Sequence, residues 1–379
     1  MKFKFLHVAD LHLGFQIRGL DRTKYCKRAI LKAINIVRDN NLDALIISGD
    51  LFENDKIYRE DIEFLNETFE LIHPKPVVIS PGNHDFLNFN CAYDQRFLNI
   101  LRIKDWSENV KIFKIPEFSN FSFGDINIYG KPCLNRQAKA FDKPINIEPS
   151  KINIAVIHAS RINFSPQGKE IWNPFEDKDI LNSNFDYVAL GHYHNYSEIS
   201  DGSVIKSAYP GSMVPVSIAE YGKRGGLIVE IIKKDNKIST EVEFVELSDF
   251  SIKKIEVSPS QNIEKIKNVI LSEISDSNNP KDSLFILKIK GMGDLSIMYL
   301  KELFSEYKIL FDTSEFTKFD MEKLKETSPE TTMGTFINEM LKLIENADGR
   351  EKQILEDALI YGLDAFAGKQ ITPRFYDEN

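Results

Sequence analysis

Five short motifs of aspartate, asparagine and histidine constrain this chain more than any other feature, because each one directly follows a short apolar segment. The motifs are Asp10-Leu11-His12, Gly49-Asp50, Gly82-Asn83-His84-Asp85, His158, and Gly191-His192-Tyr193-His194. Short apolar segments that end in turn residues are typical of buried strands. Open α/β sheets bind their ligands at the carboxyl ends of such strands. We therefore expect these motifs, although scattered along the sequence, to converge at one edge of a sheet.

The order of the apolar segments predicts an α/β fold with layered sheets. Short apolar runs that we expect to form buried strands occur at residues 3–9, 44–48, 77–80, 153–158 and 187–190. Apolar residues at helical spacing predict helices at residues 22–39 and 59–72. Strand-like segments at residues 204–206 and 226–232 indicate that the sheet turns antiparallel. Alternating strands and helices of this kind favour an α/β sandwich or layered sheet.

A second, smaller set of elements begins near residue 251. Strands are expected at residues 252–257, 284–289 and 309–312, with helices at residues 263–274 and 295–304. Beyond residue 325 the pattern is helical, over residues 335–344 and 350–361. A chain of 379 residues exceeds what one hydrophobic core usually holds. We therefore expect three parts, at residues 1–248, 249–325 and 326–379.

The composition excludes several classes of protein. No apolar run is long enough to cross a membrane, and the N-terminus leads into a strand and not into a signal peptide, so we expect a cytoplasmic protein. Cys26, Cys91 and Cys133 stand far apart, which argues against a zinc finger or a disulfide framework. The net charge of −9 counts mildly against a nucleic-acid substrate, although metal ligands are themselves acidic and bound cations offset part of this charge.

The motifs have the chemistry of a site for two metal ions. Asp10 and His12 alternate at a strand end and could reach one cation, whereas the two carboxylate oxygens of Asp50 could bridge two cations. The other candidate ligands, one amide and three imidazoles, are Asn83, His158, His192 and His194. This mixture suits Mn, Fe or Zn. Two cations about 3.5–4 Å apart can clamp a phosphate oxygen and activate water. His84 is left over, and is suited to protonate a leaving alkoxide.

In this order, the motifs resemble the signature of the calcineurin-like metallophosphoesterases. The most particular stretches are Leu6-His-Val-Ala-Asp-Leu-His-Leu-Gly14, Ser48-Gly-Asp-Leu-Phe52, Pro81-Gly-Asn-His-Asp85, Ala189-Leu-Gly-His-Tyr-His194 and Tyr209-Pro-Gly-Ser212. They resemble the DNA-repair exonuclease branch, which includes the bacterial SbcD and YhaO-type proteins and the meiotic-recombination nuclease of archaea and eukaryotes. The likeness covers about residues 1–245 and extends, by the order of elements only, to the small second domain.

The resemblance implies a fold and a ligand set. The fold would be a layered β-sandwich flanked by helices, with a small α/β capping domain and a helical C-terminal tail. One Mn²⁺ would be held by Asp10, His12, Asp50 and His194, and the other by Asp50, Asn83, His158 and His192. Asp50 would bridge the two ions, and His84 would act on the leaving group.

The resemblance also implies an activity and partners. Members of this branch cleave DNA with Mn²⁺ during double-strand-break repair, as 3′-to-5′ exonucleases on duplex ends and endonucleases on single strands. They act as homodimers with an SMC-like coiled-coil ATPase of the SbcC type, which would dock on the tail at about residues 325–369. Candidate helices for the dimer surface are at residues 22–39 and 91–101.

Further residues have subsidiary predicted roles. The position three after Asp50 is Glu53, where archaeal and eukaryotic relatives commonly have His. We hypothesise that Glu53 accepts a hydrogen bond from the His84 ring and orients it. The candidates for substrate contact are Arg18, Arg22 and Tyr193.

Two other functions share these ligands. A small-molecule or cyclic-nucleotide phosphodiesterase would use the same residues but would not need the second domain and the tail. A non-catalytic scaffold of the ATPase complex would keep the fold but would have no use for His84. The absence of Asp-Arg-Gly from the segment after Asp50 argues against a Ser/Thr protein phosphatase.

Overall fold

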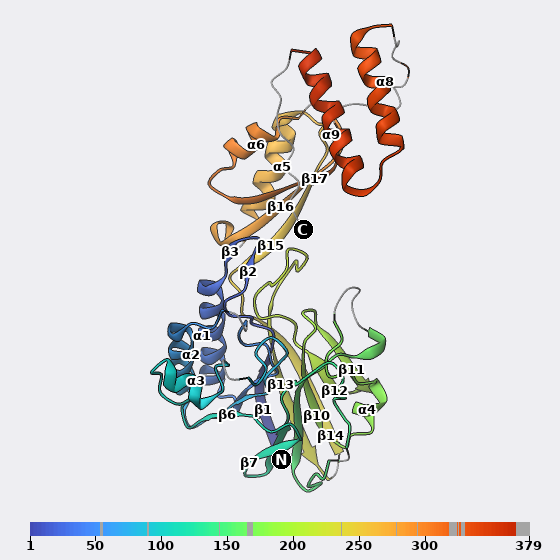
Figure 1. Ribbon diagram of the computed structural model, residues 1–379. Helices are drawn as coiled ribbons and strands as arrows, with labels where there is room; N and C mark the ends of the chain where they lie inside the picture. The colour runs from blue at the N-terminus through green and yellow to red at the C-terminus, as the bar shows by residue number, and fades with distance from the viewer. Residues whose placement is uncertain are drawn as a thin grey trace. The chain divides into compact units, whose positions relative to one another are not determined.

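A computed structural model describes residues 1–53, 56–88, 91–143, 145–164, 170–235, 237–277, 279–293, 295–317, 324, 326 and 330–368. The chain divides into two compact units, Met1–Ser251 and Ile252–Asn379. Figure 1 shows the elements of each unit, coloured along the chain. Among the described residues, no helix combines the length and the hydrophobicity that a membrane span requires.

The first unit contains two six-stranded sheets. The first sheet has the strand order β14-β13-β1-β4-β5-β6. Its strands are β1 (Lys2–Val8), β4 (Ala44–Ile47), β5 (Val77–Ile79), β6 (Val110–Ile112), β13 (Gly225–Lys234) and β14 (Lys237–Glu246). Strands β1, β4, β5 and β6 run parallel, and β13 and β14 complete the sheet in antiparallel pairs.

The second sheet has the order β11-β12-β10-β9-β8-β7. Its strands are β7 (Ser119–Phe123), β8 (Ile126–Gly130), β9 (Ile152–His158), β10 (Tyr187–Gly191), β11 (Ser197–Asp201) and β12 (Val204–Tyr209). A separate small hairpin pairs β2 (Gln16–Ile17) with β3 (Leu20–Asp21). Strands β8, β9, β10 and β12 are parallel, with antiparallel strands at both edges.

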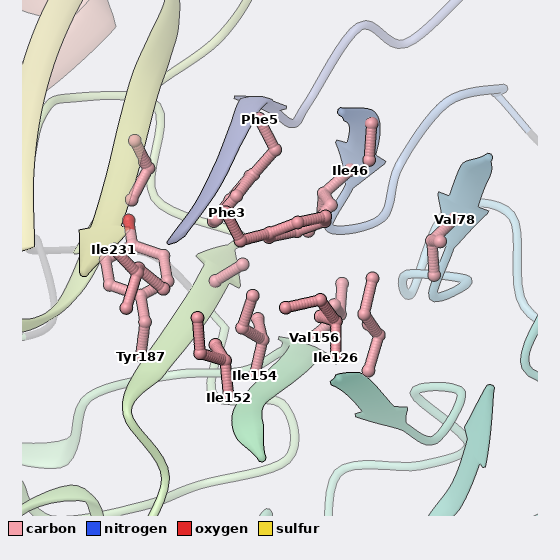
Figure 2. Close-up of a cluster of buried hydrophobic side chains, with 14 of the residues drawn as sticks. Phe3, Phe5, Ile46, Val78, Ile126, Ile152, Ile154, Val156, Tyr187 and Ile231 are labelled. Atoms are coloured by element: carbon pink, nitrogen blue, oxygen red, sulfur yellow. The ribbon is translucent and has the colours of Figure 1, made fainter. Parts of the chain in front are cut away.

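The two sheets pack face to face over one hydrophobic core. Alternate residues of a strand point to the same face, so Phe3 and Phe5 of β1 face the same way as Ile231 of β13. They meet Ile154 and Val156 of the second sheet in the cluster that Figure 2 shows. This confirms the predicted fold class, a layered α/β structure with a β-sandwich core.

Helices cover the outer faces of both sheets (Figure 1). On the first sheet lie α1 (Thr23–Asp39), α2 (Arg59–Glu70) and α3 (Gln95–Ile100), and α1 packs against β1 and β4. On the second sheet lie α4 (Asp177–Leu181) and the short 3-10 helix η2 (Ile162–Phe164). Because both faces are covered, the central strands are apolar along their whole length, as in β4 with Ala-Leu-Ile-Ile.

The registers align the strand ends that carry the motifs. Val8 of β1 pairs with Ile47 of β4, which pairs in turn with Ile79 of β5. In the second sheet, His158 of β9 pairs with Gly191 of β10. The residues that follow these strands therefore emerge at a common edge within each sheet.

The second unit is a smaller α/β structure followed by two helices. Its sheet has the order β15-β16-β17, and β16 and β17 are parallel. The elements are β15 (Ser251–Val257), α5 (Ile263–Ser275), the 3-10 helix η3 (Pro280–Asp282), β16 (Ser283–Met292), α6 (Ile297–Leu303), β17 (Lys308–Thr317), α8 (Thr332–Glu345) and α9 (Gly349–Phe366). Helices α8 and α9 pack on each other closely, and a Cβ on Gly362 would lie 2.2 Å from the ring of Phe336.

Some expectations differ from the structure. The helix expected at residues 91–101 begins at Gln95, because the Asp94 carboxylate caps it by accepting a hydrogen bond from the Arg96 N–H at 2.8 Å. Strands β6, β7, β8, β11 and β14 were not predicted. The division after Ser251 does not separate a C-terminal part, and residues 325 and 369–379 lie outside the described residues. The three-part assignment stays a prediction.

A pair of substitutions on β13 tests the sandwich core. Ile231 is fully buried between the sheets, whereas the side chain of Ile232 is 37% exposed. We expect Ile231→Ala to lower the free energy of unfolding of the first unit by about 2–5 kcal/mol, and Ile232→Ala to cost much less. Urea unfolding of both variants measures this difference. Equal losses would contradict the two-sheet core.

Candidate metal centre

The residues of the five motifs lie together where the two sheets meet. Asp10 and His12 follow β1, and Asp50 follows β4. The backbone N–H of His192, after β10, donates to both carboxylate oxygens of Asp10 at 3.1 Å. This contact joins the first sheet to the second directly at the site. The predicted convergence of the motifs is therefore what the structure contains, and their roles as metal ligands stay a prediction.

The backbone is strained at these residues. Asp10, His12 and Asp50 have φ values of 53°, 48° and 51°, in the left-handed region that costs free energy for residues other than glycine, and His192 has a φ of 112°. The strands extend into paired loops, because the N–H of His12 donates to the carbonyl of Asp50 at 2.9 Å. Left-handed turns aim successive side chains at the same space, which extended strands do not do.

A glycine in each sheet permits the close approach. A Cβ on Gly49 would lie 2.4 Å from Nδ1 of His158, and Gly49 itself has a φ of +95°. A Cβ on Gly191 would lie 1.9 Å from the carbonyl oxygen of Ser48. No larger side chain fits at either position without moving the backbone of the opposite sheet.

Backbone carbonyls orient two of the imidazoles. Nδ1 of His158 lies 2.9 Å from the carbonyl oxygen of Ser48, and Nε2 of His192 lies 3.0 Å from that of Glu170. A carbonyl only accepts, so these nitrogens carry the proton and donate. The lone pairs are left on Nε2 of His158 and Nδ1 of His192, which lie 2.9 and 3.1 Å from Oδ1 of Asn83.

Carboxylates orient the other two imidazoles. Nδ1 of His12 lies 3.2 Å from Oε2 of Glu53, and Nδ1 of His194 lies 2.7 Å from Oε1 of Glu220. Burial raises the pKa of Glu220, but its hydrogen bonds, that of His194 first, outweigh burial and lower the pKa to about 2. Both imidazoles therefore present Nε2 to the site. This arrangement, with one ring nitrogen fixed by an acceptor, is how metal-binding histidines are usually held.

Asp50 lies at the centre of the site. Its Oδ2 is 3.6 Å from Nε2 of His12 and 3.2 Å from Nε2 of His158, which come from different sheets. Burial raises its pKa, but His158 and His12 outweigh this and hold the pKa well below its usual value. Nε2 of His194 lies 3.9 Å from Oδ1 of Asp10. The candidate ligand atoms of Asp10, His12 and His194 all lie within 4.8 Å of one another.

These donors fit divalent cations. Nε2 of His12 is fully buried, has no hydrogen-bond partner in the described part of the chain, and lies near the Asp50 carboxylate. A buried polar atom of this kind needs a partner. Imidazole nitrogens combined with carboxylate and amide oxygens suit Mn, Fe or Zn.

His84 is more exposed than the candidate ligands. Its side chain is 42% exposed, its Nδ1 lies 2.9 Å from Oε1 of Glu53, and its backbone N–H donates to Oδ1 of Asp50 at 2.8 Å. Burial lowers the pKa of His84, but Glu53 and Asp50 outweigh it and raise the pKa above its usual value. Burial likewise opposes, but does not prevent, the lowering of the Glu53 pKa to about 2 by His12 and His84. The hypothesised contact between Glu53 and His84 is present, and Glu53 also holds His12.

Comparison with known proteins agrees with this geometry. The family model of calcineurin-like phosphoesterases matches residues 3–196. The chain belongs to the calcineurin-like phosphoesterase family. The predicted resemblance is confirmed, and the histidines beside Asp10 and Asp50 form groups that could hold metal ions in this phosphoesterase.

Curated relatives fall in the predicted branch. The DNA double-strand break repair protein Mre11 of Sulfurisphaera tokodaii is 24% identical, over 94% of this chain and 93% of that protein. The SbcD subunit of the nuclease SbcCD of Staphylococcus epidermidis is 25% identical, over 89% of this chain and 93% of that protein. The uncharacterized metallophosphoesterase YhaO of Bacillus subtilis is 27% identical, over 61% of this chain and 58% of that protein.

Two of the predicted substrate contacts are wrong for this phosphoesterase. Arg22 is fully buried, and its guanidinium donates to the carbonyls of Leu11 and His12 at 3.2 Å and to that of Val214 at 3.1 Å. Tyr193 is 3% exposed, and its hydroxyl donates to the carbonyl of Arg161. Neither side chain has the surface that a substrate contact needs.

Arg18, the third candidate, is exposed. It lies at the turn between β2 and β3, where its φ is 48°.

Asp85 was missed as a functional residue of the phosphoesterase. It is fully buried, and its carboxylate accepts from the N–H groups of Gly82 at 2.6 Å and Leu51 at 2.7 Å and from the hydroxyl of Tyr93 at 2.7 Å. Burial and the nearby Asp50 raise the pKa of Asp85 to about 6. It thus joins the loops after β4 and β5. Its place at the end of the Gly-Asn-His-Asp motif was the signal available in the sequence.

The role of Asp85 is testable by an isosteric change. Asp85→Asn keeps one oxygen and turns its NH₂ towards donors, which leaves buried N–H or O–H groups without an acceptor. We expect the free energy of unfolding to fall by about 1–3 kcal/mol. Chemical denaturation, with the exposed Asp201→Asn as the matched control, measures the loss. Two variants of equal stability would show that Asp85 does not join these loops.

Proposed function

We propose that this chain is a Mn²⁺-dependent DNA nuclease that acts in double-strand-break repair. The observation that carries the proposal is the set of four imidazoles, each with one nitrogen fixed by an acceptor and the other facing Asp10, Asp50 or Asn83. Its support for DNA comes from relatives named as a double-strand break repair protein and a nuclease subunit, which match over most of both chains.

In this proposal, two cations share the Asp50 carboxylate. The first would be held by Asp10, His12, Asp50 and His194, and the second by Asp50, Asn83, His158 and His192. Bound cations would neutralise phosphate charge and make water a stronger nucleophile. The contacts of Asp50 Oδ2 with His12 and His158 support the shared position. Mn²⁺ is the expected metal, in keeping with the branch resemblance.

His84 would protonate the leaving oxygen of the cleaved phosphodiester. Its Nδ1 is held by Glu53, so Nε2 is the nitrogen that remains to face a substrate. Its raised pKa keeps the proton on the ring near neutral pH, and its exposed side chain can reach a phosphate that lies over the site. Glu53 would hold the ring in this orientation.

The rest of the proposal follows the resemblance. Residues 249–325 would be a DNA-capping domain, and residues 326–379 would dock an SMC-like coiled-coil ATPase of the SbcC type, as the printed name of the SbcCD relative suggests. The protein would be a homodimer in the cytoplasm. It would act as a 3′-to-5′ exonuclease on duplex ends and an endonuclease on single strands, with the exposed Arg18 near its DNA.

An assay of purified protein with Mn²⁺ tests the nuclease. We expect wild type to shorten an end-labelled DNA duplex and His84→Ala to reduce the rate by about 10²–10⁴-fold, since general acid catalysis is lost. His73→Ala, an exposed histidine after α2, is the matched control and should keep the wild-type rate.

The same assay separates the alternatives. If a cyclic-nucleotide diester is hydrolysed while the duplex and single strands stay intact, also with the ATPase added, the protein is a small-molecule phosphodiesterase. If neither substrate is cleaved under any of these conditions, the protein is a scaffold.

Glu53 has its own test. Glu53→Gln presents one oxygen and one NH₂ to two imidazoles that both need an acceptor, so either His84 or His12 turns. We expect turnover to fall by about 10- to 100-fold with the fold intact by circular dichroism. Glu60→Gln, on the exposed surface of α2, is the control. Turnover within about twofold of wild type would rule out the positioning role.

A further inference from the structure

We infer that Glu220 is a positioning residue of the first metal site, and that through His194 it sets the affinity of that site alone for a divalent cation. The inference rests on the proposed two-metal centre. Glu220 stands 26 residues after His194, outside every motif. It touches no candidate ligand atom facing the metal, so it would act through the orientation of the imidazole.

The Glu220 carboxylate is itself held rigidly. Oε1 lies 2.7 Å from Nδ1 of His194, while Oε2 accepts from the hydroxyl of Ser212 at 2.7 Å and from the N–H of Val216 at 3.0 Å. Glu220 is 7% exposed and Ser212 is fully buried. With both oxygens engaged, the carboxylate cannot turn away from His194, and the ring is held with Nε2 towards Asp10.

The segment from Ser212 to Arg224 also holds the backbone of His194. The His194 carbonyl accepts from the N–H of Ser212 at 3.1 Å and from the guanidinium of Arg224. Arg224 donates as well to Oδ1 of Asn195 at 3.0 Å. Side chain and main chain of His194 are thus fixed by the same stretch of sequence.

The same segment reaches the other side of the first site. Ala9 forms a β-bridge with Ser212, and Val214 accepts from Arg22, whose guanidinium also holds the carbonyl of His12. The loops that carry two candidate ligands of the first cation, from different sheets, therefore share one support.

The two proposed sites differ in how their imidazoles are fixed. His158 and His192, of the second site, donate to backbone carbonyls, which no substitution of the acceptor side chain removes. His194 donates to a side chain. A change at Glu220 can therefore alter the first site while the supports of the second site stay in place.

Glu220→Gln tests this asymmetry. The glutamine oxygen can still accept from Ser212 and Val216, which turns its NH₂ to Nδ1 of His194. An NH₂ only donates, so the imidazole must carry its proton on Nε2, where it cannot bind a cation. We expect calorimetric Mn²⁺ titration of the full chain to show two sites in wild type. In the variant, one should be weakened by about 10- to 100-fold and the other kept within about twofold.

The controls separate this inference from the proposed function. Glu241→Gln, on the exposed face of β14, should titrate like wild type. If wild type takes up fewer than two Mn²⁺, the metal centre itself is wrong. If wild type binds two and folded Glu220→Gln is indistinguishable from it, the role of Glu220 alone is overturned.

A measurement on the unaltered chain covers the case in which the variant does not fold. In metal-free, ¹⁵N-histidine-labelled protein at about pH 8, two-bond correlation spectra report the tautomer of each neutral imidazole. We expect His194, assigned from the signal lost in His194→Gln, to carry its proton on Nδ1. A proton on Nε2 would overturn the inference.

Discussion

The buried carboxylate of Asp50 is the interaction on which the rest of the structure depends. A carboxylate removed from water needs positive charge and donors around it, or it is strongly destabilising. His12 comes from the first sheet and His158 from the second, so the only way to surround Asp50 is to bring the two sheets together at these strand ends. The sandwich core and the site therefore require each other, and a chain that lost either would lose the other's geometry.

The cost of this arrangement is visible in the backbone. The left-handed φ values of Asp10, His12 and Asp50 each oppose folding, and they persist because the strands that precede them are buried on both faces. Asp85 and Arg22 add support by satisfying carbonyl and N–H groups of the same loops. Buried polar side chains next to the site thus offset strain within it, and their own charges do not reach solvent.

Local patterns predicted the central elements and the convergence of the motifs, because a buried strand such as β4 is a continuous apolar run with a distinct end. Strands with mixed exposure, such as β7 and β14, escaped prediction because alternating or polar faces give a weaker signal. Arg22 was assigned to substrate because sequence shows charge but not burial. Glu220 was invisible for a different reason: its contact with His194 depends on a loop return that no local periodicity encodes.

The position of β1 has a consequence for how the chain matures. β1 lies between β4 and β13, and β13 ends only at Lys234, so one edge of the first strand stays unpaired while the intervening segment is synthesised. The contact between Asp10 and the His192 N–H closes a separation of 182 residues, and such distant contacts form late. A metal ion therefore meets the site only after most of the first unit has left the ribosome, and the nascent N-terminal strand must be shielded from aggregation until then.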